Sequence, residues 1–151
     1  SDDAELLLFC ASRVQLMRQV ILPFLDQGGI VICDRFADST TAYQGYGRGL
    51  NLELIRQLHE IATTGRWPDL TFMLDLSVEE MEQRGQMRLE TLDQQDRFED
   101  ESRRFRQAVR KGYLVLARLE PDRIKLVDAT GERQTIHQTI MGEVDHAIAR
   151  A

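Results

Sequence analysis

Three short apolar runs, each followed by an aspartate, constrain the fold of this chain more than any other feature of its sequence. The runs cover residues 30–33, 70–74 and 124–127, and the aspartates are Asp34, Asp75 and Asp128. Short continuous apolar runs are typical of strands buried on both faces of a parallel sheet. Segments with helical spacing separate them, which predicts an α/β fold: a parallel sheet with flanking helices. Ligands of such sheets bind beyond the carboxyl ends of the strands.

Five segments are predicted to be helices. Apolar residues recur three or four positions apart over 4–25, 51–64 and 105–119, and a last helix is expected over 133–150. Ser77 and Glu80 match a capping box, so another helix begins there and continues into the charged stretch 82–104. Asp75 either caps that helix or faces the ligand edge of the sheet. The stretch 36–50 is rich in glycine, serine, threonine and tyrosine, and no helix is predicted in it.

Composition excludes several classes of protein. The 151 residues suffice for one domain, and the net charge of −6 argues against a protein that coats a nucleic acid polymer. Cys10 and Cys33 lie in apolar runs without metal-site spacing, so both are predicted to be reduced core residues of a cytoplasmic protein. No membrane-spanning segment or signal peptide is predicted. His59, His137 and His146 share no metal-ligand spacing and are expected at the surface or satisfied within the core.

The richest set of polar groups follows the first apolar run. Asp34 and Arg35 are succeeded by hydroxyls, an amide and closely spaced glycines up to Gly49. A guanidinium such as that of Arg35 can clamp a phosphate with two parallel hydrogen bonds. Asp34 can hold a water bound to Mg²⁺ or align Arg35. The alternative is a structural ion pair that leads into a glycine-rich loop.

Phe9 and Arg13 are four residues apart on the first predicted helix and therefore share a face. The ring could stack on a nucleobase while the guanidinium reaches the edge of the base. The alternative is a core phenylalanine beside a surface arginine.

Together these residues resemble bacterial thymidylate kinases, which transfer the γ-phosphoryl group of ATP to dTMP to give dTDP for dTTP synthesis. The resemblance runs over essentially the whole chain. Its most specific part is the string from Asp34-Arg35-Phe36 through Ser39-Thr40 to Ala42-Tyr43-Gln44-Gly45. Further matches are Glu5 to Phe9 with Arg13, Pro68-Asp69-Leu70-Thr71, and Asp96-Arg97-Phe98-Glu99.

The resemblance implies the P-loop nucleoside monophosphate kinase fold, with 1–151 as the carboxyl-terminal part of a single kinase domain and about 82–104 as its lid segment. Phe9 would stack on thymine and Arg13 would bond its 4-carbonyl. Arg35 would hold the phosphate, with Asp34 near Mg²⁺, either directly or through water. The other implied dTMP residues are Ser39, Thr40, Tyr43 and Gln44, and Tyr43 would crowd the sugar 2′ position. Arg84, Arg88 and Arg97 would close over the ATP phosphates, or instead pair with neighbouring acids.

The family's P-loop, G-x-x-x-x-G-K-[ST], has no match here, since the chain contains no Gly-Lys pair. In the family that loop follows a first strand that lies inside the sheet. The 151 residues are therefore expected to be a piece of a longer kinase, inactive and unstable by themselves. The resemblance also implies a homodimer, with the helix over 4–25 as a contributor. Two alternatives stay open: a kinase for another nucleoside monophosphate, and a non-catalytic nucleotide-binding module.

Overall fold

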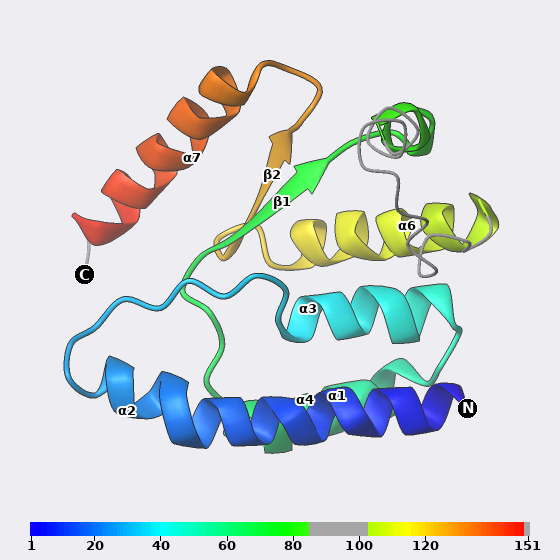
Figure 1. Cartoon of the computed structure of the whole chain (residues 1–151), viewed down its shortest axis with the longest axis vertical. Coiled ribbons are helices and arrows are strands. Elements are labelled where there is room, and N and C mark those ends of the chain that lie inside the picture. Colours follow the sequence, from blue (N-terminus) through cyan, green and yellow to red (C-terminus); the bar gives the residue numbers. More distant parts are fainter. Residues whose placement is uncertain (85–102, 150–151) are drawn as a thin grey trace, which may run out of the picture. The chain divides into compact units, whose positions relative to one another are not determined.

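The computed structural model describes residues 1–84 and 103–149. Their backbone divides into two compact units. The first unit contains Ser1–Trp67 together with Lys111–Tyr113, and the second unit contains the described residues of Pro68–Arg110 and Leu114–Ala151. Figure 1 labels the helices and strands of both.

The first unit begins with one long helix, as its apolar spacing predicted. It consists of α1 (Asp2–Leu16), the π-helical turn η1 (Met17–Ile21) and α2 (Leu22–Leu25), which follow one another without a break. The side chain of Ser1 caps its start by accepting from the Ala4 amide. Gly28 follows its end with a φ of +79°, a left-handed conformation that glycine adopts without steric cost.

This helix packs against α4 (Leu52–Thr63), which is also where a helix was predicted and which Asn51 caps. Leu6 and Cys10 of α1 form a core with Ile55 and Ala62 of α4. By length and composition alone, Asp2–Leu25 could cross a membrane, which the sequence analysis did not predict. Leu6, Cys10, Met17 and Ile21 of this helix are buried in the first unit.

The glycine-rich stretch after residue 36 is helical, which its composition did not predict. It forms α3 (Ala37–Thr40) and continues as the π-helical η2 (Thr41–Gly47). Every residue of α3 is buried, as are Ala42, Gln44 and Gly45 of η2. Tertiary packing therefore outweighs the weak helix propensity of serine, threonine and glycine here.

The strand predicted over 30–33 is wrong. These residues have no regular secondary structure, and Ile30 and Ile32 are 73% and 95% exposed. The prediction that Cys33 is a core residue is also wrong, because its side chain is exposed, whereas Cys10 is buried and free as expected. A strand persists only when its amides and carbonyls pair with a neighbour. Within the described residues, only β1 and β2 make such a ladder.

The second unit holds that ladder, at the positions predicted for the other two strands. β1 (Thr71–Asp75) pairs in parallel with β2 (Ile124–Asp128), with Thr71 opposite Ile124 and Asp75 opposite Asp128. The helices α6 (Arg103–Leu119) and α7 (Arg133–Ile148) accompany the strands, which confirms the predicted α/β class with flanking helices. The Ser77–Glu80 capping box also forms, at the start of helical residues 78–84.

Candidate functional site

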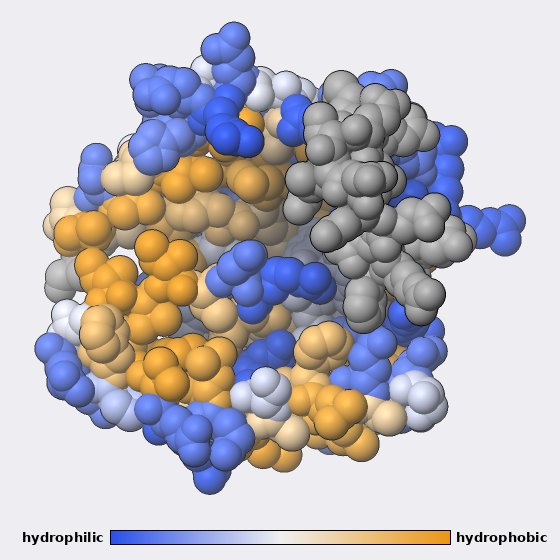
Figure 2. All heavy atoms as spheres, in the orientation of Figure 1, coloured by the Kyte–Doolittle hydropathy of each residue, from blue (hydrophilic) through white to orange (hydrophobic). Residues whose placement is uncertain are grey.

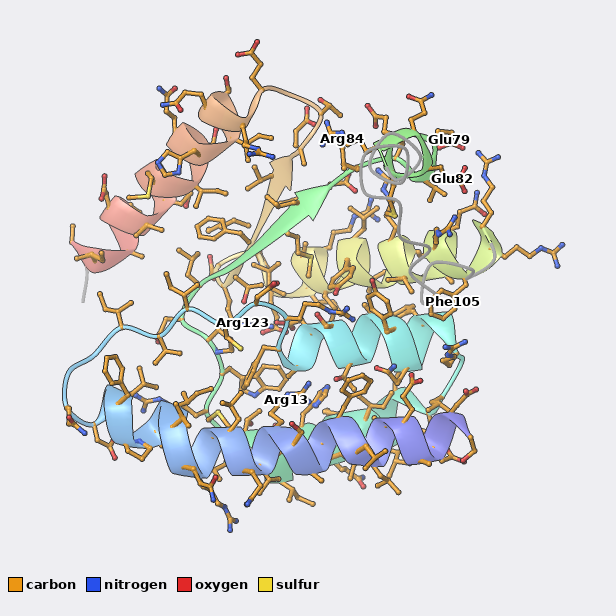
Figure 3. All side chains as sticks on the ribbon, viewed as in Figure 1. Arg13, Glu79, Glu82, Arg84, Phe105 and Arg123 are labelled. Carbon is orange, nitrogen blue, oxygen red and sulfur yellow. The ribbon has the colours of Figure 1, made fainter. Side chains whose placement is uncertain are left out.

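Several polar residues of the first unit are buried, among them Arg13, Asp38, Ser39, Thr40 and Gln44, and we call this set the polar cluster. The side chain of Arg13 leaves α1 toward α3 (Figure 3), and its Nη2 donates to Thr40 Oγ1 at 2.8 Å and to the Phe36 carbonyl at 3.2 Å. The guanidinium also lies over the Phe36 ring, 5.3 Å from its centroid. Burial lowers the pKa of Arg13 from its ordinary value, and the nearby Asp38 carboxylate opposes that shift. The group keeps its charge because a guanidinium does not deprotonate in proteins.

One nitrogen of Arg13, Nη1, is buried and has no hydrogen-bond partner among the described residues. An unpaired buried donor costs about 1–3 kcal/mol, and more when it is charged. Such an atom is therefore suited to an acceptor that a ligand brings.

Gln44 also belongs to the polar cluster and is 4% exposed. Its Nε2 donates to the Glu5 carboxylate of α1 at 2.6 Å. This bond turns the amide group so that its carbonyl oxygen lies on the opposite branch, where it can accept from another donor. Glu5 was part of the resemblance but had no assigned role, and it proves to orient a predicted binding residue.

Arg35 and Asp34, which precede α3, are exposed. The Arg35 guanidinium lies over the Tyr43 ring, 4.4 Å from its centroid. Arg35 also has a φ of +64°, a left-handed conformation that is costly for a residue with a side chain. Strain of this kind persists only where the surroundings impose it, and it marks Arg35 as a residue whose direction is tightly set.

Ser39 and Tyr43 share a partner that the sequence did not reveal. The Tyr113 hydroxyl of α6 donates to Ser39 Oγ at 2.9 Å, and its ring meets the Tyr43 ring edge-on at 6.4 Å. The helical spacing of α6 had suggested only a packing role for Tyr113. Burial raises the pKa of Tyr113, so its hydroxyl remains a donor at neutral pH.

His59 of α4 lies fully in the core rather than at the surface. It is 1% exposed, and its Nε2 lies 3.0 Å from Thr41 Oγ1. Its ring meets Trp67 edge-on at 5.7 Å. Burial and the positive charge of Arg13 lower the pKa of His59 to about 4, so the imidazole is neutral at pH 7.

The remaining predicted residues differ in their surroundings. Phe9 is 47% exposed on α1, one turn before Arg13. Arg84 belongs to the second unit, where its Nη2 donates to the Thr130 carbonyl at 3.3 Å (Figure 3). Arg88 and Arg97, with most of the lid segment, lie outside the described residues.

Asp75 has a partner that was not predicted. Its two oxygens accept from Nε and Nη2 of Arg110 in α6, at 2.7 and 2.8 Å. Its side chain thus pairs with a cation and not with the start of the helix after Ser77, which Glu80 and Ser77 cap themselves. The pair spans 35 residues of sequence, so no local pattern pointed to it.

The described residues contain no group of three or more carboxylate, histidine or cysteine side chains placed to hold a metal ion. A single exposed carboxylate such as Asp34 suits Mg²⁺ that arrives with nucleotide phosphates, because Mg²⁺ keeps several waters and needs only one or two protein carboxylates. Asp34 therefore suits a metal ion that a nucleotide brings to the site.

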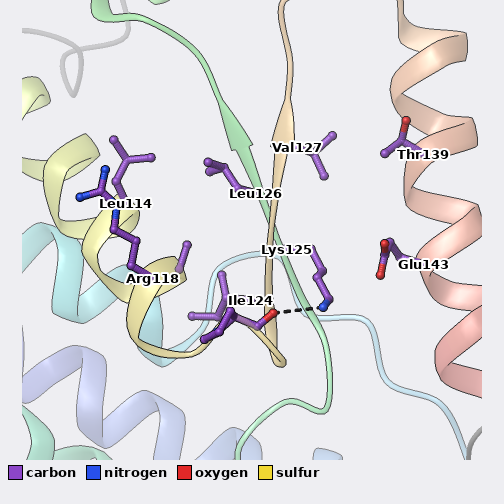
Figure 4. Close-up of a pocket in the computed structure, with 10 residues that line it drawn as sticks. Leu114, Arg118, Ile124, Lys125, Leu126, Val127, Thr139 and Glu143 are labelled. Atoms are coloured by element: carbon purple, nitrogen blue, oxygen red, sulfur yellow. Dashed lines mark hydrogen bonds between the residues drawn. The ribbon is translucent and has the colours of Figure 1, made fainter.

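A pocket of about 390 Å³ lies in the second unit (Figure 4). Its lining comes from α6, β2, α7 and Pro121 before β2, and the Lys125 amine donates to the Pro121 carbonyl. The lining is mostly aliphatic, with two cations and one carboxylate: Leu114, Ala117, Arg118, Pro121, Ile124, Lys125, Leu126, Val127, Thr139 and Glu143. None of the predicted nucleotide-binding residues is among them.

Comparisons with known proteins all identify the same family. A family model described as thymidylate kinase matches residues 1–140. Thymidylate kinase of Syntrophotalea carbinolica is 50% identical over 130 residues, which cover 85% of this chain and 60% of that protein. Thymidylate kinase of Nitratidesulfovibrio vulgaris (strain DSM 19637 / Miyazaki F) is 46% identical over 145 residues, which cover 94% of this chain and 67% of that protein.

Solved structures agree. The crystal structure of thymidylate kinase from Ehrlichia chaffeensis matches 95% of this chain and 67% of its own, with a TM-score of 0.74 and 31% sequence identity. The chain thus spans 60 to 67% of the length of the proteins to which it is similar.

Proposed function

This chain belongs to the thymidylate kinase family, and from that membership we propose that the protein phosphorylates dTMP with ATP. The structural similarity confirms the predicted fold class, that of the nucleoside monophosphate kinases. The observation that carries the proposal is the buried Nη1 of Arg13, a charged donor without a partner among the described residues.

Arg13 supplies recognition of the base. Position 4 of thymine carries a carbonyl, whereas cytosine carries an amino group there. Because a guanidinium can only donate, it pairs with the carbonyl and rejects the amino group. Phe9, one turn away and partly exposed, stacks on the ring, while Thr40 and Gln44 lie near its edge. A wrong base leaves these buried groups unpaired, and that is the source of the discrimination.

Arg35 holds the phosphate of dTMP, with Ser39 and Tyr43 beside it. The contact between the Arg35 guanidinium and the Tyr43 ring supports this role, because it holds a long side chain ready for a bidentate bond. Tyr43 crowds the sugar 2′ position and favours deoxyribose.

ATP would enter with Mg²⁺, which Asp34 would help to hold. The ion would supply neutralisation of charge on the phosphates. Arg84, Arg88 and Arg97 act on the ATP side and neutralise charge on the transferred group. The acceptor oxygen of dTMP is already anionic near pH 7, so the chain needs no strong general base. The rate comes from positioning and charge neutralisation.

The test is an assay of ADP formation by the full-length protein with MgATP and one acceptor at a time: dTMP, dUMP, dCMP, AMP or dGMP. We expect turnover mainly with dTMP and, more weakly, with dUMP, which has the same 4-carbonyl. Calorimetric titration of dTMP runs in parallel. Preferred turnover of a purine nucleotide would overturn the assignment of the base site, and dTMP binding without turnover would overturn the assignment as a kinase.

We propose in addition that the protein is a cytoplasmic homodimer. Leu8, Leu16, Val20 and Phe24 recur at multiples of four along Asp2–Leu25 and are 39 to 72% exposed. Apolar surface gathers over this helix in Figure 2, and a second copy would cover it. Light scattering after gel filtration tests this: the dimer mass is expected for the unmodified protein and the monomer mass for Leu8→Glu. A monomer in both would contradict the proposal.

A further inference from the structure

The middle of α6 is seated against η2 in the first unit. Lys111–Tyr113 are the α6 residues that belong to this unit. The backbone of Gly112 lies so close to Tyr46 that a Cβ at Gly112 would be 2.7 Å from Cδ2 of that ring. No side chain fits in that space without a shift. The contact therefore fixes the position along α6 at which the next residue, Tyr113, faces the polar cluster.

Tyr113 has two contacts there, and both are to residues assigned to the acceptor nucleotide. Its hydroxyl donates to Ser39 Oγ at 2.9 Å, at the start of the α3–η2 helix. Its ring lies edge-on to Tyr43, with the two planes at 78°. The hydroxyl thus restrains one site residue and the ring another.

The second contact extends to Arg35. The Tyr43 ring that Tyr113 touches is also the ring over which the Arg35 guanidinium lies. Arg35 is exposed, and an arginine that is free to move loses side-chain entropy when it binds a ligand. A fixed aromatic surface beneath it reduces that loss before the nucleotide arrives.

We propose that Tyr113 is a positioning residue of the acceptor site. It holds Ser39 through its hydroxyl and Tyr43 through its ring, and through Tyr43 it keeps the Arg35 guanidinium in place for the acceptor phosphate. The inference rests on the proposed function, since it assumes that the nucleotide lies beside these residues.

Two substitutions separate the two contacts. Tyr113→Phe removes the hydrogen bond and keeps the ring, and we expect it to raise KM for dTMP about 3- to 10-fold. Tyr113→Leu removes both contacts, and we expect a rise of about 10- to 100-fold. Neither should change KM for ATP more than about twofold, since one lost hydrogen bond at the acceptor side does not reach the donor nucleotide.

Tyr46→Phe is the matched control, because it makes the same chemical change to a neighbouring tyrosine outside the assigned site. A Ser39→Ala, Tyr113→Phe double variant completes the cycle. If the two hydroxyls act as a pair, the dTMP KM of the double variant is no higher than that of the more affected single variant.

A residue that merely packs would lower thermal stability and change both KM values together. That result, or a dTMP KM for Tyr113→Phe equal to that of Tyr46→Phe, would overturn the inference. Calorimetric titration of dTMP into each variant gives a readout without turnover. An unmodified protein that binds dTMP but does not phosphorylate it would contradict the proposed function alone, while weaker dTMP binding by Tyr113→Phe would still support this inference.

Discussion

The arginines of the two units are used in different ways. In the first unit, Arg13 is buried, bonds two neutral oxygens and keeps one nitrogen unpartnered within the described residues. In the second unit, Arg103, Arg106 and Arg110 each pair with a carboxylate, from Glu79, Glu82 and Asp75. A cation that the protein has already neutralised contributes to stability, whereas one bonded to neutral oxygens retains charge for a ligand. The same residue type thus serves binding at Arg13 and stability at Arg103, Arg106 and Arg110.

The largest effect in the first unit is a loss of stability at low pH, which we expect from the buried His59. Its pKa is about 4 in the folded protein and near 6.5 when unfolded, so the unfolded state binds more protons between these values. Stability is complete above pH 6.5 and falls as pH drops toward 4, by about 3 kcal/mol. The charged groups that act on His59 are Arg13 of α1, which opposes protonation, and Asp38 of α3, which favours it.

Urea unfolding at pH 7 and pH 4.5 measures this loss. His59→Gln serves as the reference, because glutamine can bond Thr41 without titrating. Carboxylates titrate in both proteins, so only the difference between the two pH slopes reports on His59. Equal slopes would show that the imidazole is not held neutral by the core.

The next largest effect concerns ligand affinity. Arg13→Lys keeps the charge but loses the planar, forked donor, so we expect dTMP affinity to fall about 10- to 30-fold. Arg18→Lys, the same change at an exposed site on the same long helix, should leave affinity within about twofold. Calorimetric titration checks both. Similar losses in the two variants would show that the buried, forked donor of Arg13 has no special role in binding dTMP.

In the second unit, the pair of Asp75 and Arg110 should affect stability and not binding. Asp75→Asn removes the charge that receives two hydrogen bonds. The two side chains are 22% and 38% exposed, so solvent screening limits the expected loss to about 1 kcal/mol of unfolding free energy. Thermal unfolding measures this loss. A large change in dTMP affinity without a change in stability would show that Asp75 has a role in binding instead.

The smallest effect is expected at Arg103. Its ion pair with Glu79 is more than half exposed on both sides, so Arg103→Ala should change stability by about 0 to 0.5 kcal/mol. The difference from the unmodified protein should vanish in 0.5 M salt, about the range where the Debye length falls below 5 Å. Urea unfolding at two salt concentrations tests this, and a loss that persists in high salt would indicate that the arginine also packs.

Local patterns predicted the elements whose partners lie nearby or follow a regular period. The long first helix, α4, α6, α7 and both strands of the ladder are where apolar spacing placed them. The capping box at Ser77 also formed, because it needs only four consecutive residues. The strand expected over 30–33 failed, because an apolar run specifies burial but not the neighbour with which it pairs.

The site was predictable in its residue types but not in its supporting contacts. Arg13, Thr40 and Gln44 were named from motifs, and Arg13 bonds Thr40 directly. Two groups that orient site residues were not predicted: Glu5 lies 39 residues from its partner Gln44, and Tyr113 lies 74 residues from its partner Ser39. Helix formation in α3 and η2 was missed for a similar reason, since burial against α1 and α4 outweighs local propensity.

The left-handed backbone at Arg35 has a consequence for anyone who engineers this protein. Glycine would occupy that conformation without strain, so a search for more thermostable variants should favour Arg35→Gly. The same change would remove the guanidinium assigned to the acceptor phosphate. Selection for heat resistance would therefore favour glycine at this position, whereas selection for turnover would favour arginine.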